Sequence, residues 1–215
     1  ATFPIAAFTD RRTRGEFLAW RDRLAVTRGR RQADYIFSTL ATILAWATDR
    51  GLVPINPCER PGRLYRSTRA ETIWSLEDEA DFMRVAPAPL RLAFILAVWT
   101  GQRQGDLLRL SWNAYDGKTI RLKQSKGGRR VVVPVSAPLR AALDAEKRRA
   151  VTILTNSKGC PWTSDGFRTS WGKAVKNASV SGRTFHDLRG TAVTRLALAG
   201  ASEAEIASIT GHSLK

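Results

Sequence analysis

The sequence is poor in cysteine and histidine and has no long apolar run. Its two cysteines, Cys58 and Cys160, lack the Cys/His spacing of a zinc site. Isolated cysteines are expected to stay reduced, which fits a cytoplasmic location. The longest apolar run, residues 92–99, is far short of the roughly 20 residues that cross a bilayer. Neither a membrane partner nor a bound metal is therefore expected.

Negative charge is also scarce. The chain has 215 residues, with 35 lysines and arginines against 19 acidic residues, so its formal net charge is +16. Hydrophobic residues make up 43%, which is enough for a sizeable core. The positive charge is spread over both halves of the chain, which indicates a polyanionic partner that contacts both. Charge alone also fits a soluble basic protein without such a partner.

The first part of the chain is expected to be helical. Apolar spacing predicts helices over residues 14–26 and 32–49, and Gly51 follows the second as a helix stop. The apolar stripe of the second helix comprises Ile36, Leu40, Ile43, Leu44 and Ala47. Three prolines then interrupt the pattern, which places a linker at residues 60–70. We therefore predict two domains, residues 1–65 and 66–215.

The second domain is predicted to be mainly helical with a small antiparallel β-sheet. Residues 119–124 and 130–135 are rich in β-formers, and the Ser-Lys-Gly-Gly between them predicts a hairpin. Helices are expected at residues 75–86, 90–99, 106–110, 139–150, 164–177, 186–199 and 202–211. Ser75 and Ser202 each precede acidic residues, as an N-cap does.

The segment Thr100-Gly101-Gln102-Arg103 places an arginine directly after an apolar helix and a glycine. Glycine permits a tight turn, so Arg103 is expected to lie on a rigid element and to face out of the core. Its planar guanidinium matches two phosphate oxygens. Asp106 is expected to brace Arg103 or the adjacent backbone. The pattern also fits an ordinary surface arginine near a helix start.

The two histidines of the chain lie near its end. His186 and Arg189 are three residues apart on a predicted helix, so they share one face at its positive N-terminal end and could address one phosphate. His212 follows Gly211, and a helix-ending glycine projects the next side chain off the helix. Taken singly, these residues also fit a capping histidine, a solvated arginine and an exposed terminal histidine.

Lys126 is expected at the tip of the predicted hairpin. A lysine there could reach into a groove and donate a proton to a leaving oxygen. Arg129 and Arg130 follow it and are expected to contact backbone phosphates. Lys123 is a rival position for the proton donor, and lysine is also common at exposed turns without any catalytic role.

In chain order these residues read Arg103, Lys126, His186-x-x-Arg189 and His212. The series resembles the catalytic domain of the tyrosine recombinases, the phage integrase family. Residues 1–65 resemble the helical core-binding domain of that family, whose last helix runs into a Gly-x-x-x-x-Asn-Pro segment. The resemblance implies that these five residues are catalytic, that Asp106 supports them, and that an α+β catalytic domain follows the core-binding domain.

The resemblance also implies the activity and the partners. DNA would be cut and rejoined through a 3′-phosphotyrosyl intermediate, with no cofactor and no metal. The partner would be double-stranded DNA, contacted in the first domain by the basic residues Arg28, Arg30 and Arg31. The complete protein would assemble as a homotetramer on DNA.

The nucleophilic tyrosine of the family is expected shortly after the last histidine. Tyr35, Tyr65 and Tyr115 all precede His186, so none matches that position. We therefore expect the chain to be a fragment, monomeric on its own, that binds DNA without cleaving it. Two other interpretations stay open: a non-catalytic DNA-binding or regulatory protein on the same scaffold, and a type IB topoisomerase.

Overall fold

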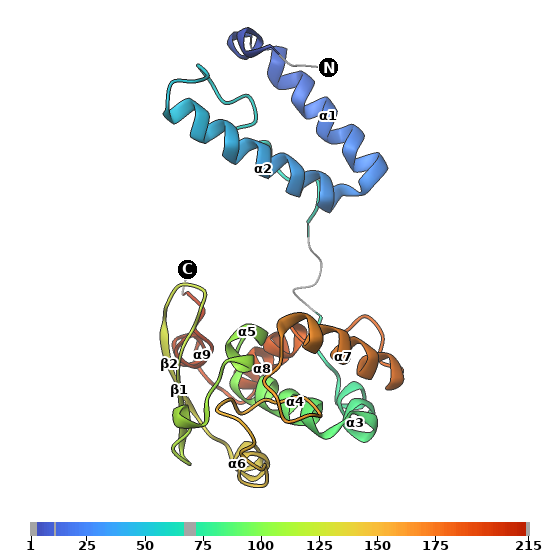
Figure 1. Cartoon of the computed structure of the whole chain (residues 1–215), viewed down its shortest axis with the longest axis vertical. Helices are drawn as coiled ribbons and strands as arrows, with labels where there is room; N and C mark the ends of the chain where they lie inside the picture. Colours follow the sequence, from blue (N-terminus) through green and yellow to red (C-terminus); the bar gives the residue numbers. More distant parts are fainter. Residues whose placement is uncertain (1–3, 11, 67–71, 214–215) are drawn as a thin grey trace. The chain divides into compact units, whose positions relative to one another are not determined.

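The computed structural model describes residues 4–10, 12–66 and 72–213. The chain divides into two compact units, Ala1–Thr68 and Arg69–Lys215 (Figure 1). The last residues of the predicted linker, 67–70, lie outside the described residues. Within the described ranges, no helix combines the length and the apolar character needed to cross a membrane.

The first unit is built from two packed helices. A 3₁₀ helix, η1 (Ile5–Thr9), precedes α1 (Arg12–Arg28) and α2 (Arg30–Asp49). Gly29 separates the two long helices with a φ of 83°, a conformation that glycine adopts without strain. Phe37 is completely buried and centres a small core. Ile43, predicted in the buried stripe, is instead 56% exposed, because the buried face of α2 runs through Ala33, Phe37, Leu44 and Ala47.

The second unit packs its helices around one apolar helix. The helices are α3 (Leu76–Val85), α4 (Ala88–Thr100), α5 (Gln104–Leu108), α6 (Ala137–Asp144), α7 (Ser164–Asn177), α8 (Asp187–Leu198) and α9 (Glu203–Thr210). The apolar run of residues 92–99 lies in α4, which is buried along most of its length and contacts α5, α6 and α8. A helix that is apolar on nearly all sides is stable only in such a position.

A hairpin of two antiparallel strands, β1 (Thr119–Lys123) and β2 (Arg130–Pro134), completes the second unit. Its inward side chains alternate as expected for a strand, and Ile120, Val131 and Val133 are buried. Helix α9 lies beside β2 (Figure 1). The predicted fold class, mainly α with a small antiparallel sheet, is confirmed.

One predicted helix is wrong in length. Residues 139–150 were expected to be helical, but α6 ends at Asp144. Its buried contacts come from Leu139 and Leu143, whereas residues 146–149 read Glu-Lys-Arg-Arg and offer no apolar side chain to bury. Without an apolar face, helix propensity alone does not extend the helix.

Candidate functional site

Four of the predicted residues lie on segment ends that meet in the second unit. Arg103 is the N-cap of α5 and follows Gly101, whose left-handed conformation ends α4. His186 is the N-cap of α8, and Arg189 lies in the first turn of that helix. His212 follows Gly211, the left-handed cap of α9. Helix ends bring backbone groups and side chains together without interrupting the core.

Arg189 occupies the centre of this site. It is only 5% exposed, and its Nη1 donates to the carbonyl oxygens of Gly101 at 2.5 Å and Thr210 at 2.8 Å. Its Nη2 is buried and has no hydrogen-bond partner among the described residues. Burial, with the nearby positive charge of Arg103, lowers the pKa of Arg189 to about 10, although Asp106 opposes this shift. The guanidinium is therefore charged at neutral pH and buried, and its Nη2 lacks a hydrogen-bond acceptor.

Arg103 reaches the same place from the other side. Its Nη1 donates to Oε1 of Gln124 at 3.2 Å, and Nε2 of Gln124 donates to the carbonyl oxygen of Thr210 at 2.7 Å. That carbonyl oxygen is also an acceptor for Arg189. The two guanidinium groups are therefore linked through one amide and one carbonyl, and the charge of Arg103 acts on Arg189.

His212 and His186 lie at the edge of this positive site. Nδ1 of His212 is 2.8 Å from the hydroxyl of Thr210. Partial burial lowers the pKa of His212 below its ordinary value of 6.5, and the charges of Arg189, Arg103 and His186 add to the effect. The imidazole is therefore neutral at pH 7, and an anion placed among these cations would favour its protonated form.

A titration of the histidines tests this arrangement. In the free chain the pKa of His212 should lie below 6.5, and binding of a DNA duplex should raise it, because a phosphate offsets the surrounding positive charge. Nuclear magnetic resonance of the imidazole groups measures the pKa of His212 without and with DNA. A His186→Gln variant shows which of the two histidine signals belongs to His212. A His212 pKa that falls when DNA binds would contradict an anion site here.

Asp106 supports a different neighbour from the one expected. Its buried Oδ1 accepts from the backbone N of Ser125 at 2.9 Å and from the hydroxyl of Ser125 at 2.8 Å, and it also pairs with Arg109 at 3.2 Å. Arg103 is not among the hydrogen-bond partners found for it in the described part of the chain. Asp106 thus fixes the start of the hairpin loop rather than the guanidinium of Arg103.

Lys126 lies on that loop and is exposed. Within the described residues it makes no hydrogen bond or ion pair, so the structure does not bring it into contact with the arginines and histidines. The loop itself is anchored on one side, since Ser125 is held by Asp106. The ammonium group of Lys126 is therefore unpaired in the described structure and lies on a loop, directly after the anchored Ser125.

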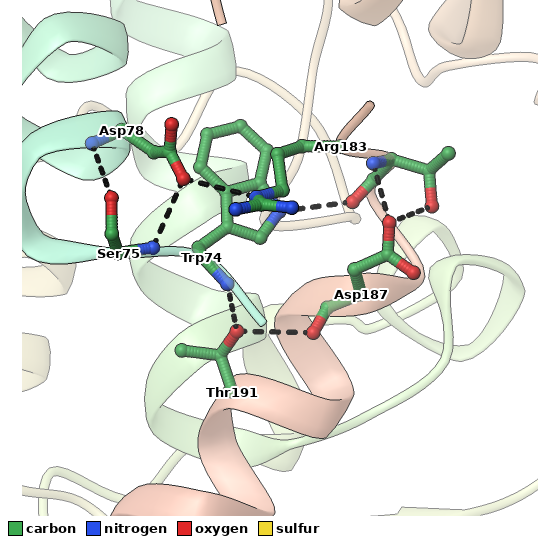
Figure 2. Close-up of polar contacts among 7 residues, drawn as sticks. Trp74, Ser75, Asp78, Arg183, Asp187 and Thr191 are labelled. Atoms are coloured by element: carbon green, nitrogen blue, oxygen red, sulfur yellow. Dashed lines mark hydrogen bonds and ion pairs between the residues drawn. The ribbon is translucent and has the colours of Figure 1, made fainter. Parts of the chain in front are cut away.

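The start of α8 is held by a polar cluster that Figure 2 shows in close-up. Asp187 accepts from the backbone N of Thr184 at 2.6 Å and from its hydroxyl at 2.8 Å. The buried Trp74 donates through its backbone N to the hydroxyl of Thr191 at 2.9 Å, and through Nε1 to the carbonyl oxygen of Thr184 at 3.1 Å. These bonds join α8, the helix that carries Arg189, to the segment before α3.

A salt bridge strengthens the same join. Nε of Arg183 lies 2.9 Å from Oδ2 of Asp78, the residue that also closes a capping box with Ser75 at the start of α3 (Figure 2). Arg195 pairs with Glu79 at 2.6 Å further along the two helices. The groups are partly buried, so solvent screens them less than it screens surface pairs.

The residues predicted to contact DNA outside this site are all exposed. Arg129 donates to the backbone oxygen of His212 at 2.5 Å, while Arg130 begins β2. In the first unit, Arg28, Arg30 and Arg31 surround the turn between α1 and α2. These three arginines line a surface depression together with Gln32, Tyr35 and Tyr65.

The described tyrosine of the second unit is not placed as a nucleophile. Tyr115 is 8% exposed, and its hydroxyl donates to Oδ1 of Asp144 at 3.1 Å. Burial and this carboxylate raise the pKa of Tyr115, which disfavours the phenolate. Tyr35 and Tyr65 belong to the first unit.

Two buried residues beside Arg103 and Arg189, Gln102 and Gln124, are not predicted from the sequence; each is 1% exposed. A signal for Gln124 was available, because it continues the inward alternation of Ile120 and Leu122 along β1. A glutamine on the inward face of a strand must find buried partners. No comparable pattern marks Gln102.

Comparisons with known proteins identify the family and the fold of this chain. The family model of the phage integrase family matches residues 68–215. An integrase of Escherichia phage HK022 is 33% identical over 111 residues, 51% of this chain and 31% of the relative. A shufflon-specific DNA recombinase of Escherichia coli is 31% identical over 126 residues, 57% of this chain and 32% of the relative. The chain thus spans about a third of the length of these two relatives.

A solved structure agrees along nearly the whole chain. The crystal structure of lambda integrase bound to DNA superposes with a TM-score of 0.76 and 25% identity, over 94% of this chain and 77% of that one. The fold is a helical unit followed by a mainly helical unit with a small hairpin, and the second unit brings two arginines and two histidines close together. The chain belongs to the phage integrase family.

Proposed function

We propose that this chain is the DNA-binding and phosphate-activating part of a site-specific recombinase. One observation carries the proposal: Arg189 is a buried guanidinium with an unpartnered Nη2, and Arg103 lies beside it. A buried cation that lacks an acceptor is stabilised by an anion. A DNA phosphate supplies one, and it is flanked there by two histidines.

The reaction would exchange one phosphodiester for another. A tyrosine hydroxyl attacks the scissile phosphorus, the bond from phosphorus to the 5′ oxygen breaks, and a 3′-phosphotyrosyl link and a free 5′-hydroxyl result. A 5′-hydroxyl of a partner strand reverses the step. The energy of the broken phosphodiester bond is conserved in the covalent protein–DNA link, so rejoining requires no cofactor.

The site residues would divide the work. Arg103, Arg189 and His212 stabilise the charge that develops on the phosphorane oxygens. Lys126 gives its proton to the leaving 5′ oxygen after its tethered loop closes on the DNA, and His186 assists proton transfer or holds the phosphate. Asp106 supports the reaction by anchoring the loop of Lys126 through Ser125.

Double-stranded DNA would be held by both units. Arg130 and the remaining N–H groups of Arg129 would contact backbone phosphates near the site, and Arg28, Arg30 and Arg31 would do so from the first unit. We place residues 1–65 as a core-binding domain and residues 66–215 as a catalytic domain. The complete protein would act in the cytoplasm as a homotetramer on DNA.

The names of similar proteins support this proposal over its alternatives. The relatives include phage integrases and a shufflon-specific DNA recombinase, and the lambda integrase structure contains DNA. A core-binding-like first unit favours a recombinase over a type IB topoisomerase. A purely DNA-binding protein has no need for two histidines beside a buried arginine and a second, partly buried one.

The test begins with the DNA site. Duplexes that bind this chain are selected from a random library, and a nicked duplex of the selected sequence is then incubated with the complete gene product. The expected result is a covalent protein–DNA adduct that survives denaturation, because the short strand beyond the cut diffuses away and prevents rejoining. Peptide mapping should assign the link to a tyrosine.

Two outcomes would overturn the proposal. Tight DNA binding without any adduct would favour a non-catalytic DNA-binding protein. Relaxation of supercoiled plasmid without recombination between two copies of the site would favour a topoisomerase. The chain of 215 residues has no tyrosine after His186, so it serves as the control and should bind the duplex without forming an adduct.

A further inference from the structure

A pair of buried glutamines joins the segments that carry the candidate site. Gln102 lies between Gly101 and Arg103, and Gln124 lies at the end of β1, yet their side chains meet. Nε2 of Gln124 donates to Oε1 of Gln102 at 2.7 Å, and both residues are 1% exposed. Burial of two amides is costly unless each polar atom is paired.

The amide of Gln124 is fully used. Its Nε2 has a second acceptor in the carbonyl oxygen of Thr210 at 2.7 Å, and its Oε1 accepts from Nη1 of Arg103 at 3.2 Å. The opposite orientation of the amide would point N–H groups at the cation of Arg103 and an oxygen at the carbonyl of Thr210. Only one orientation therefore satisfies its neighbours.

The amide of Gln102 ties the same groups to the helix ends. Its Nε2 donates to the carbonyl oxygen of Thr100 at 3.0 Å and to that of Ile209 at 2.8 Å. The first carbonyl lies at the end of α4 and the second near the end of α9. Gln102 thus holds two helix ends at a set separation while it receives the bond from Gln124.

Gly211 shows how closely this pair is packed. A Cβ at residue 211 would overlap the side-chain amide of Gln124, and the backbone there has a φ of 74°. Both features call for glycine at this position. His212 follows directly, so the position of the amide of Gln124 and the path of the chain into His212 depend on one another.

We propose that Gln102 and Gln124 are positioning residues that orient the guanidinium of Arg103 relative to Arg189 and His212. Gln124 acts directly, because it accepts from Arg103 and shares the carbonyl of Thr210 with Arg189. Gln102 acts through Gln124. Neither glutamine needs to touch the phosphate. The effect of the glutamines on strand cleavage rests on the proposed function, whereas their effect on the position of the arginines does not.

The structural part is tested with this chain alone. In Gln124→Met the side-chain N–H signals of Arg103 should shift or broaden in nuclear magnetic resonance spectra, while those of the exposed Arg84 stay unchanged. Gln102→Met keeps the bond from Arg103 to Gln124 and should perturb Arg103 less. Unchanged Arg103 signals in a folded Gln124→Met chain would refute the inference, whatever the protein is later found to do.

The functional part uses single-turnover cleavage of the nicked duplex by the complete gene product. Gln124→Met should slow cleavage by about 10²-fold, because a small displacement of a catalytic group has an effect of this order. The Kd for DNA should hardly change. Tyr115→Phe, which removes a partly buried hydrogen bond outside the site, is the matched control and should cleave normally.

A double-mutant cycle separates positioning from general damage. If Gln124 acts through Arg103, then Arg103→Met combined with Gln124→Met should cleave no more slowly than Arg103→Met alone. Additive losses would refute the positioning role. If Gln124→Met fails to fold, the same cycle is run with Gln102→Met. This variant should lose more of its cleavage rate than Tyr115→Phe does. The loss should disappear when Arg103→Met is already present. Absence of cleavage by the unmodified protein would instead refute the proposed function.

Discussion

Arg189→Met is expected to lower the rate of DNA strand cleavage by the complete gene product by about 10²–10³-fold, the usual effect of removing one donor from a charge-stabilising site. Arg189 is the residue whose Nη2 has no partner in the described structure and whose charge lies among Arg103, His186 and His212. Methionine keeps most of the apolar stem and removes the cation, so the developing negative charge loses its central donor.

The variant should nevertheless fold. Removing Arg189 leaves the carbonyl oxygens of Gly101 and Thr210 with one bond fewer, but it also removes a buried charge that has no salt-bridge partner in the described residues. Chemical denaturation of the chain measures the balance. Arg84→Met is the control, because Arg84 is an exposed arginine paired with Asp81 on α3. Normal cleavage by a folded Arg189→Met protein would rule out its proposed role.

The affinity for duplex DNA is expected to fall about 10³–10⁵-fold between 50 and 200 mM salt, if roughly six to ten phosphates are contacted. The physical reason is the release of counterions from DNA by a chain with a net charge of +16. Fluorescence anisotropy of a labelled duplex, titrated at several salt concentrations, gives the slope of the logarithm of the binding constant. A binding constant that does not change with salt concentration would contradict a phosphate-contacting surface.

A triple variant locates part of that surface. Replacing Arg28, Arg30 and Arg31 by glutamine should reduce the slope by roughly 2–3, about one for each lost phosphate contact. The matched control replaces the same number of exposed arginines away from the depression that these residues line, at Arg12, Arg60 and Arg84. Equal slopes for the two triple variants would mean that the turn between α1 and α2 does not contact DNA.

Local signals in the sequence predicted most of the helices of the second unit. Ser75 and Ser202 are the N-caps that their acidic neighbours indicated, and each closes a capping box. Gly211 ends α9 in the left-handed conformation expected of such a glycine. These features depend on residues within one turn of each other. For that reason they can be recognised before any tertiary contact is known.

Features that depend on distant contacts were predicted less well. Ile43 was assigned to the core because helical spacing does not reveal which of two adjacent stripes meets a partner. Asp106 was expected to brace Arg103 or nearby backbone, whereas it binds Ser125, which follows it by 19 residues. Gln102 and Gln124 are 22 residues apart in the sequence, and no pattern in the sequence predicts that their side chains pair.

The acceptors that complete the arginine site come from the end of α9, and this has a consequence for biosynthesis. Until Ile209 and Thr210 have left the ribosome, Gln102, Gln124 and Arg189 each lack an acceptor that they use in the finished fold. A nascent chain can thus form α4 and the hairpin early, but the bonds that hold the arginine site form only later. The anion site that we propose can therefore form only after α9 has left the ribosome.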